Sequence, residues 1–334
     1  MWRPVLLLFA VTASADYFNS QTPILKLDGF YTYDEMSWYL QTLSNSFKNV
    51  ELQKLTKTYE FRYVYMVKIT APQDYDCVGP KKVILLDAAI QGNEWMTTSV
   101  ALKIIHELVL NYEENKMLLE RFDWYILPMV NPDGYEYSQH PLSHFWKKNR
   151  SPNKFSSGTN LNRNFNSNWH KLSQENISPF SQQFPGNISF SERESNIIAS
   201  LMKRLYEQNQ HFLYITLQTK SRPSILYPSP LETMPPTEIK IFKMIAEYAS
   251  ANIFEDTRPL YLHIPPNEYQ RLGGSSLDYA YLQGFPLTFA LEVFEAKEFK
   301  GNPRIFIDER VFVGWSGVFN LVIYKVLNSK HPIQ

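Results

Sequence analysis

The feature that most constrains the fold is an alternation of short apolar segments with longer amphipathic ones. Residues 63–69, 83–86 and 125–130 have the composition of strands, and residues 97–112 place Val100, Ile104 and Leu108 on one helical face. This alternation predicts the α/β class, with a central mixed, mostly parallel twisted sheet flanked by helices on both faces. Further strands are expected at residues 212–218 and 286–291, and further helices from Ser191, over residues 237–251 and over residues 311–326. Because no linker or internal repeat divides the chain, we expect a single domain.

Residues 1–15 have the pattern of a signal peptide. A charged start precedes an apolar core at residues 5–11, and Ala-Ser-Ala at residues 13–15 matches a cleavage site. We therefore expect a secreted, extracellular protein, although an ordinary buried segment would also give this pattern. No other apolar run approaches the ~20 residues that a membrane-spanning helix needs, so no membrane association is expected.

The folded domain is expected to span residues 27–330. Thr32 and Glu35 form a capping-box pattern ahead of apolar residues at helical spacing. Residues 16–26 would then be a short N-terminal segment with no room for a pro-domain.

The charge balance bounds the choice of partners. The chain has 33 basic and 33 acidic residues, which argues against nucleic acid or an anionic membrane as a partner. A monomer is expected.

Cys77 is the only cysteine, so we expect a free thiol, with an intermolecular disulfide as the alternative. Asn149, Asn176 and Asn187 lie in Asn-x-Ser/Thr sequons, which predict a glycoprotein in a secretory context.

A polar turn at residues 91–95 follows the strand at residues 83–86. The carboxyl end of a strand in an α/β sheet is where ligands and catalytic groups usually lie, so Glu94 is well placed to act. The stretch from residue 131 to about residue 185 is rich in Asn and Ser and has no sustained periodicity. Loops this long within a compact domain are usually functional or disordered, and the motifs in this one favour function.

Several of these segments together resemble the zinc carboxypeptidase family of the pancreatic A/B type. Residues 91–95, Gln-Gly-Asn-Glu-Trp, are similar to the family's His-Ala-Arg-Glu-Trp signature, with Asn93 at the position of its Arg. Further similar segments, in the family's order, are Asn-Pro-Asp-Gly-Tyr at residues 131–135, Phe-Trp-Lys-Lys-Asn-Arg-Ser at 145–151 and Gly-Thr-Asn-Leu-Asn-Arg-Asn-Phe at 158–165. The resemblance implies a carboxypeptidase-like fold over nearly the whole mature chain.

The resemblance places a degenerate metal site at Gln91, Glu94 and Gln218. The family's two zinc-binding His residues correspond to Gln91 and Gln218, or to Thr219 if the alignment shifts by one residue, and none of the seven histidines falls at a ligand position. Amide side chains make a poor zinc site. No cofactor is therefore expected, and zinc would be the cofactor only if the chain were an active member.

The catalytic positions are also changed. By resemblance, the family's general base corresponds to Ala290 and its oxyanion-stabilising Arg to Lys147, so no functional catalytic residue is expected. Lys147 either keeps an electrostatic role or forms a solvated basic pair with Lys148. Glu292 lies on the same strand face as Ala290, but about 6.6 Å further along the strand, too far to replace the base.

The substrate-binding positions persist. By resemblance, Asn162 and Arg163 hold the terminal carboxylate, Tyr269 closes over the substrate, and Leu277 lines the specificity pocket. A guanidinium can pair with both oxygens of a carboxylate, and an apolar wall favours a hydrophobic C-terminal residue.

These patterns predict a secreted metallocarboxypeptidase-like pseudoenzyme whose partner is a peptide or protein C-terminus. Two alternatives remain at this point. One is an active zinc carboxypeptidase that removes C-terminal, hydrophobic amino acids, and the other is a secreted glycoprotein scaffold with a vestigial cleft.

Overall fold

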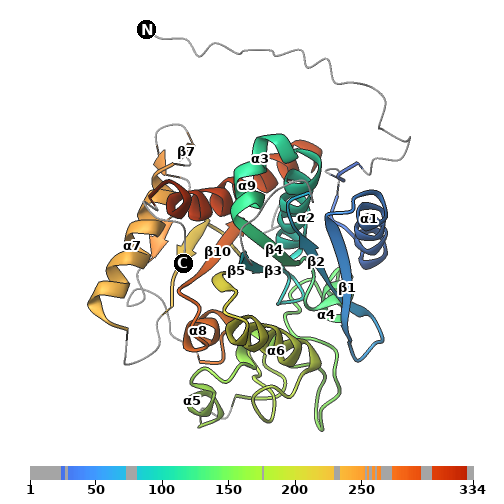
Figure 1. Cartoon of the computed structure of the whole chain (residues 1–334). Helices are drawn as coiled ribbons and strands as arrows, with labels where there is room; N and C mark the ends of the chain where they lie inside the picture. The colour runs from blue at the N-terminus through green and yellow to red at the C-terminus, as the bar shows by residue number, and fades with distance from the viewer. Residues whose placement is uncertain are drawn as a thin grey trace.

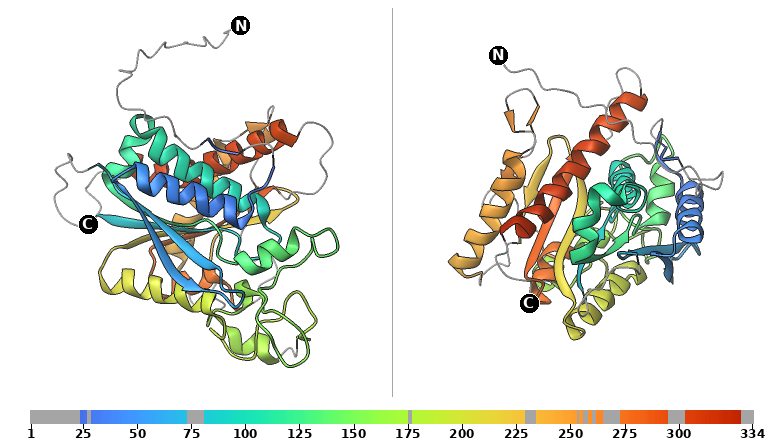
Figure 2. Two further views of the ribbon diagram at one scale, coloured as in Figure 1. Left: turned by 90° about the vertical axis from the view of Figure 1, so that its right-hand side faces the viewer. Right: turned by 45° about the horizontal axis from the view of Figure 1, so that its top comes forward.

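The computed structural model describes residues 24–26, 29–72, 81–174, 177–228, 234–252, 254–255, 258–259, 262–264, 273–294 and 303–328. Within these residues the chain folds around one large twisted sheet with helices on both faces (Figures 1 and 2). The predicted α/β class and helix-flanked sheet are confirmed. Cys77, Asn176, Tyr269 and the expected signal peptide lie outside the described residues.

The described part of the sheet has eight strands in the order β1-β2-β4-β3-β5-β10-β6-β9. Its centre is parallel, because β3 pairs in parallel with β4 and β5, and β5 with β10. Antiparallel pairs join β1 to β2, β2 to β4 and β10 to β6, and β6 pairs in parallel with β9. The strands are β1 (Val50–Lys57), β2 (Tyr63–Ile69), β3 (Lys82–Asp87), β4 (Phe122–Leu127), β5 (His211–Lys220), β6 (Ser224–Leu226), β9 (Leu262–Ile264) and β10 (Leu287–Phe294), with β7 (Phe254–Glu255) and β8 (Arg258–Pro259) paired apart from them.

Two layers of helices bury the two faces of the sheet. Alternate residues of β3 show the division, since Ile84 and Leu86 belong to one apolar cluster and Val83 and Leu85 to another. A strand buried on both faces is a nearly continuous apolar run, which is why this strand could be predicted from the sequence.

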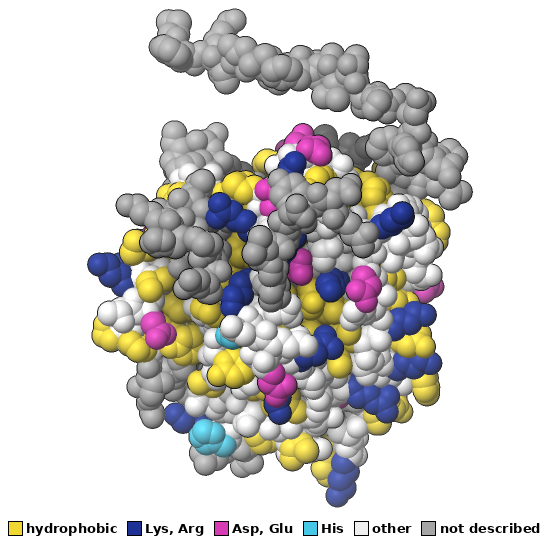
Figure 3. Space-filling model, in the orientation of Figure 1, with side chains coloured by type: hydrophobic (Ala, Val, Ile, Leu, Met, Phe, Trp, Pro, Cys, Tyr) yellow, Lys and Arg dark blue, Asp and Glu magenta, His cyan; other side chains and the backbone are white. Residues whose placement is uncertain are grey.

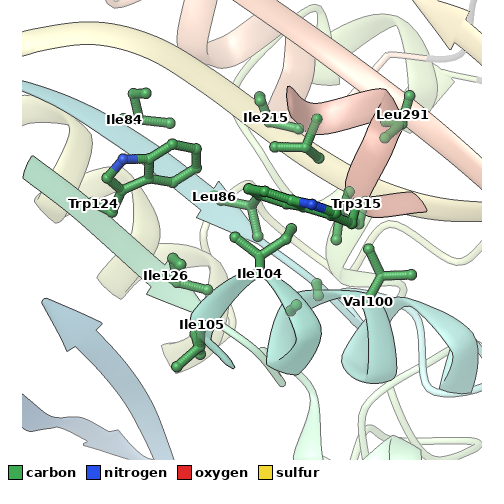
Figure 4. Close-up of a cluster of buried hydrophobic side chains, with 14 of the residues drawn as sticks. Ile84, Leu86, Val100, Ile104, Ile105, Trp124, Ile126, Ile215, Leu291 and Trp315 are labelled. Atoms are coloured by element: carbon green, nitrogen blue, oxygen red, sulfur yellow. The ribbon is translucent and has the colours of Figure 1, made fainter. Parts of the chain in front are cut away.

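The larger cluster packs helices α1, α2, α3, α7 and α9 against the sheet, and Figure 4 shows Trp124 of β4 and Trp315 of α9 within it. The second cluster packs α6 and α8 against the opposite face. The helices are α1 (Tyr33–Ser46), α2 (Trp95–Leu110), α3 (Tyr112–Arg121), α4 (Pro132–Ser138), α5 (Trp169–Gln174), α6 (Arg193–Glu207), α7 (Pro236–Ala251), α8 (Ser276–Leu282) and α9 (Pro303–Asn328), with a 3₁₀ turn η1 (Leu161–Arg163).

The capping box predicted at Thr32 forms as expected. The Thr32 side chain accepts from the backbone N–H of Glu35, and the Glu35 carboxylate accepts from the backbone N–H of Thr32. Several element boundaries differ from the sequence prediction. Strand β4 begins at Phe122 and ends at Leu127, earlier than expected, and α9 begins at Pro303 rather than at residue 311.

The surface carries no single dominant charge on the face shown in Figure 3, where acidic and apolar side chains lie between the basic ones. Among the described helices, none combines the length and the apolar character required to cross a bilayer.

Candidate functional site

The turn after β3 is held tightly against α4 and the segment that follows α4. Gly92 donates its backbone N–H to the Lys147 carbonyl at 3.0 Å. A Cβ added at Gly92 would lie 2.5 Å from the Gly134 carbonyl oxygen, so no larger residue fits without a backbone shift. This close approach fixes Gln91 and Glu94 at the carboxyl end of β3, immediately before α2.

The Glu94 carboxyl group joins this turn to the end of β5. Its side chain is 2% exposed. One oxygen accepts from the backbone N–H of Gln91 at 3.1 Å, and the other accepts from the backbone N–H of Thr219 at 3.3 Å. Burial raises the pKa of Glu94 to about 8, although these N–H groups and the nearby Lys147 charge act in the opposite direction. Glu94 therefore acts as a hydrogen-bonded bridge between two strand ends.

The side chains at the predicted metal positions do not fit a zinc ion. Structural and catalytic zinc sites use His nitrogen, Cys sulfur and carboxylate oxygen, whereas Gln91 and Gln218 offer carboxamides. Both oxygens of Glu94 already accept backbone hydrogen bonds. Within the described part of the chain, no group of three or more His, Cys, Asp and Glu residues is placed to hold a metal ion.

Ala290, at the predicted position of the general base, is fully buried in an apolar environment. It packs with Leu226 of β6 and Leu277 of α8. It pairs with Thr216 on β5 and with Leu226 on β6. No carboxylate among these neighbours could accept a proton in its place.

Glu292 is occupied elsewhere, in agreement with its expected displacement. Its carboxylate accepts from Lys220 Nζ at 3.0 Å and from the Ser224 hydroxyl. The ion pair with Lys220 joins β10 to the end of β5, so Glu292 takes part in a contact between neighbouring strands.

Arg163 combines a partly buried guanidinium with unused hydrogen-bonding capacity. Its Nη1 donates to the Asn162 carbonyl at 2.7 Å, whereas its Nε is buried and has no hydrogen-bond partner among the described residues. Burial lowers the pKa of Arg163 to about 10, and the carboxyl groups of Asp278 and Glu94 oppose this shift. The side chain is thus a cation at neutral pH, and a buried donor without a partner is a feature that a bound anion would satisfy.

Asn162 and Leu277 are linked through one short segment. The Asn162 side-chain oxygen accepts from Ser276 N at 3.1 Å and from Ser276 Oγ at 3.3 Å. Gly274 has a φ of +78°, and a Cβ there would lie 2.1 Å from the Arg163 carbonyl oxygen. The structure therefore brings Asn162, Arg163 and Leu277 together, with Leu277 5% exposed.

Lys147 and Lys148 do not form a solvated pair. Lys148 is 1% exposed, and its Nζ donates to the Pro179 carbonyl at 2.7 Å. Burial lowers the pKa of Lys148 to about 8, with a further contribution from the Arg150 charge. The solvated-pair alternative is therefore wrong for Lys148. Lys147 is partly buried, and its charge acts on Glu94.

The sequence reasoning missed a buried polar floor beneath the site. Asp87 is 1% exposed and accepts a hydrogen bond from the Tyr214 hydroxyl, and burial raises the pKa of Asp87 to about 6. Its second oxygen and the Thr216 hydroxyl have no hydrogen-bond partner among the described residues. A carboxyl residue directly after an apolar strand was the available signal.

The fold and this arrangement of side chains define a carboxypeptidase-like protein. A family model described as zinc carboxypeptidase matches residues 36–309, so the chain belongs to the zinc carboxypeptidase family.

The chain is similar to several named members of this family. It is 30% identical over 273 residues to human mast cell carboxypeptidase A, covering 79% of this chain and 62% of that protein. It is also 30% identical over 270 residues to zinc carboxypeptidase A 1 of Drosophila melanogaster, covering 79% of this chain and 61% of that protein. The chain therefore spans less than two thirds of the length of these relatives.

Solved structures support the same fold. The crystal structure of carboxypeptidase A from Helicoverpa armigera superposes with a TM-score of 0.79 at 26% identity, covering 92% of this chain and 76% of that chain. Bovine thrombin-activatable fibrinolysis inhibitor, in complex with tick carboxypeptidase inhibitor, superposes with a TM-score of 0.76 at 24% identity, covering 90% of this chain and 99% of that one.

Proposed function

We propose that this chain is a secreted, carboxypeptidase-like pseudoenzyme that binds the free C-terminus of a peptide or protein without cleaving it. The observation that carries the proposal is Arg163, whose guanidinium lies beside Asn162 with its buried Nε lacking a hydrogen-bond partner among the described residues. Leu277 directly follows Ser276, whose backbone N–H donates to the Asn162 side-chain oxygen. An apolar C-terminal residue is the ligand that these side chains favour.

The absence of cleavage follows from the donor atoms at the other positions. Hydrolysis in this family needs a metal to activate water and a base to take up its proton. Carboxamides at positions 91 and 218 are poor zinc ligands, and the Ala290 methyl group accepts no proton. Removal of a general base alone typically costs about 10²- to 10⁴-fold in rate, and weaker oxyanion stabilisation about 10²- to 10³-fold, without simple additivity.

The remaining parts of the proposal concern where the protein acts. Residues 1–15 would be removed on secretion, residues 16–26 would form a short segment, and residues 27–330 would form the domain. Secretion is supported by the sequence of the first fifteen residues. The protein would act as a monomer with no bound cofactor.

The binding proposal can be tested with one pair of peptides. The purified full chain is titrated by calorimetry with a peptide ending in a free apolar residue and with the same peptide amidated at its C-terminus. A hydrogen bond to a charged group is worth about 1.5–3 kcal/mol, so the free acid should bind about 10- to 100-fold more tightly. Equal affinity for the two forms would remove the proposal.

A matched pair of variants assigns the effect to one side chain. Arg163→Ala should abolish the preference for the free acid, whereas Arg204→Ala, which removes an exposed positive charge from α6, should leave it unchanged. If binding to a partner protein survives Arg163→Ala unaltered, the chain is a scaffold whose cleft takes no part.

A further inference from the structure

The three sequons predicted from the sequence differ in their structural surroundings. Asn149 is 1% exposed. Its side-chain nitrogen donates to Glu192 Oε2 at 2.8 Å, and its side-chain oxygen accepts from Thr159 N at 2.9 Å and from Ser151 Oγ at 3.0 Å. The amide nitrogen to which a sugar would be attached is therefore enclosed in a hydrogen-bond network.

Asn187, in contrast to the buried Asn149, is open to solvent. It is exposed and lies in a turn, and the next residue, Ile188, is 64% exposed. The turn is firmly held, because Asn164 Nδ2 donates to the carbonyls of Pro185 at 2.9 Å and Ile188 at 3.0 Å, and Phe190 N donates to the Asn164 carbonyl at 2.7 Å. A large polar group on Asn187 would extend into solvent without disturbing these bonds.

We propose that Asn187 carries an N-linked oligosaccharide and that Asn149 does not. This inference rests on the proposed secretion, since the modification belongs to the secretory route. In the transfer, the Asn187 amide nitrogen forms a bond to C1 of the sugar while the bond from C1 to the oxygen of a lipid pyrophosphate donor breaks. One amide proton is released, and the lipid pyrophosphate leaves.

Burial excludes Asn149 for a physical reason. A sugar on its nitrogen would displace the Glu192 carboxylate and would have to fit where the side chain is almost fully enclosed. Leaving buried polar groups without partners costs about 1–3 kcal/mol for each group. A chain modified at Asn149 would therefore not reach this fold, and the folded population would lack that glycan.

The glycan would be attached close to the proposed carboxylate anchor. Asn164, which holds the Asn187 turn, directly follows Arg163 in the chain. The modification would thus lie on the turn held by the residue after Arg163, while leaving the hydrogen bonds of Asn162 and Arg163 intact.

The test is expression of the full chain in a secreting animal cell line, followed by enzymatic deglycosylation in ¹⁸O-labelled water and peptide mass spectrometry. Labelled aspartate is expected at position 187 in most secreted molecules and is not expected at position 149. Ser189→Ala destroys the Asn187 sequon but keeps the asparagine. This variant should lack one glycan and should therefore migrate faster on a denaturing gel. Ser151→Ala, which destroys the Asn149 sequon in the same way, should remove none.

A parallel expression with the leader replaced by a known secretory leader separates the two proposals. If only this version enters the medium and carries the label at position 187, the secretion proposal fails and the assignment of the acceptor stands. An unmodified Asn187 in the secreted chain, or a labelled position 149 in folded protein, would overturn the assignment.

Discussion

The candidate site has two halves. The anchor half is Asn162, Arg163 and Leu277, and the metal half is Gln91, Glu94, Gln218 and Ala290. The two halves differ in charge and in hydrogen-bonding capacity. At the anchor half, Arg163 donates from Nη1 to the Asn162 backbone carbonyl, and its buried Nε lacks a partner among the described residues. At the metal half, the Glu94 carboxyl group is bound by two backbone N–H groups, and Ala290 is enclosed by Leu226 and Leu277. One half contains a cation with a buried donor that lacks a partner among the described residues, whereas in the other half both Glu94 oxygens already accept backbone hydrogen bonds and the base position is a methyl group.

The two halves of the candidate site lie on different elements of the fold. Asn162 and Arg163 lie on η1 and Leu277 on α8, whereas the metal positions lie at the ends of β3 and β5 and the base position lies within β10. Under the proposed function, substitutions at these strand positions would remove catalysis while the anchor residues keep their contacts.

The largest expected effect is a loss of stability caused by a backbone clash at the anchor half. Gly274→Ala should destabilise the fold by about 3 kcal/mol or more, because a Cβ would lie 2.1 Å from the Arg163 carbonyl oxygen at a φ of +78°. Denaturant unfolding measures this loss. Gly29→Ala is the control, since its Cβ would meet only the Lys26 side chain at 3.5 Å. A variant at position 274 as stable as this control would show that the anchor is not fixed in this way.

Reintroducing a carboxylate tests how fully the metal half is closed. Ala290→Glu should cost about 2–3 kcal/mol in unfolding free energy, because the new group would be buried between Leu226 and Leu277 without a charged partner. Ala290→Ser, a smaller polar change, serves as the comparison. Unchanged stability together with release of a C-terminal amino acid would mean that the catalytic position remains usable.

Restoring imidazoles should convert the metal half into a zinc site. Glu94 lies within hydrogen-bond distance of the backbone of residue 219, so Gln91→His combined with Gln218→His would place two imidazoles near one carboxylate. Zinc at 100 times its dissociation constant should then stabilise the double variant by about 2.7 kcal/mol, measured by thermal unfolding with and without chelator. A zinc-induced shift of the same size in the unsubstituted chain would show that no restoration was needed.

The smallest expected effect concerns the floor beneath the metal half. The pKa of Asp87 is raised to about 6 in the folded state, above its ordinary value of about 3.9. The folded state therefore holds an extra proton between about pH 4 and pH 6, and its stability should fall as the pH rises through that interval and then level off.

Asp87→Asn should remove this fall and be more stable than the parent by roughly 2 kcal/mol at neutral pH. Chemical denaturation across this pH range provides the measurement, and Asp308→Asn, at an exposed position on α9, is the control. Parallel profiles for the Asp87 variant and the parent would refute the assignment.

Local patterns could be predicted where local interactions determine the structure. Strand β2 and the capping box at Thr32 form where the sequence places them. Strand β1 could not be predicted, because its residues are only partly buried at the edge of the sheet and lack a clean apolar alternation. Helix α4 lies inside the stretch expected to be a loop, begins at a Pro and is only seven residues long.

The candidate site depends on contacts between residues far apart in sequence. Glu94 meets Thr219, and Asn162 meets Ser276, so periodicity alone could not have joined them and only the resemblance placed them together. The burial of Lys148 and Asn149 was also not predictable locally, since both are polar residues in a polar loop. The roles assigned to these site residues remain predictions.

The most direct test of the central claim is the zinc content of the purified full chain after exposure to one equivalent of zinc and desalting. The account predicts far less than one zinc ion per chain by mass spectrometry of the metal. One tightly held zinc ion per chain would contradict it.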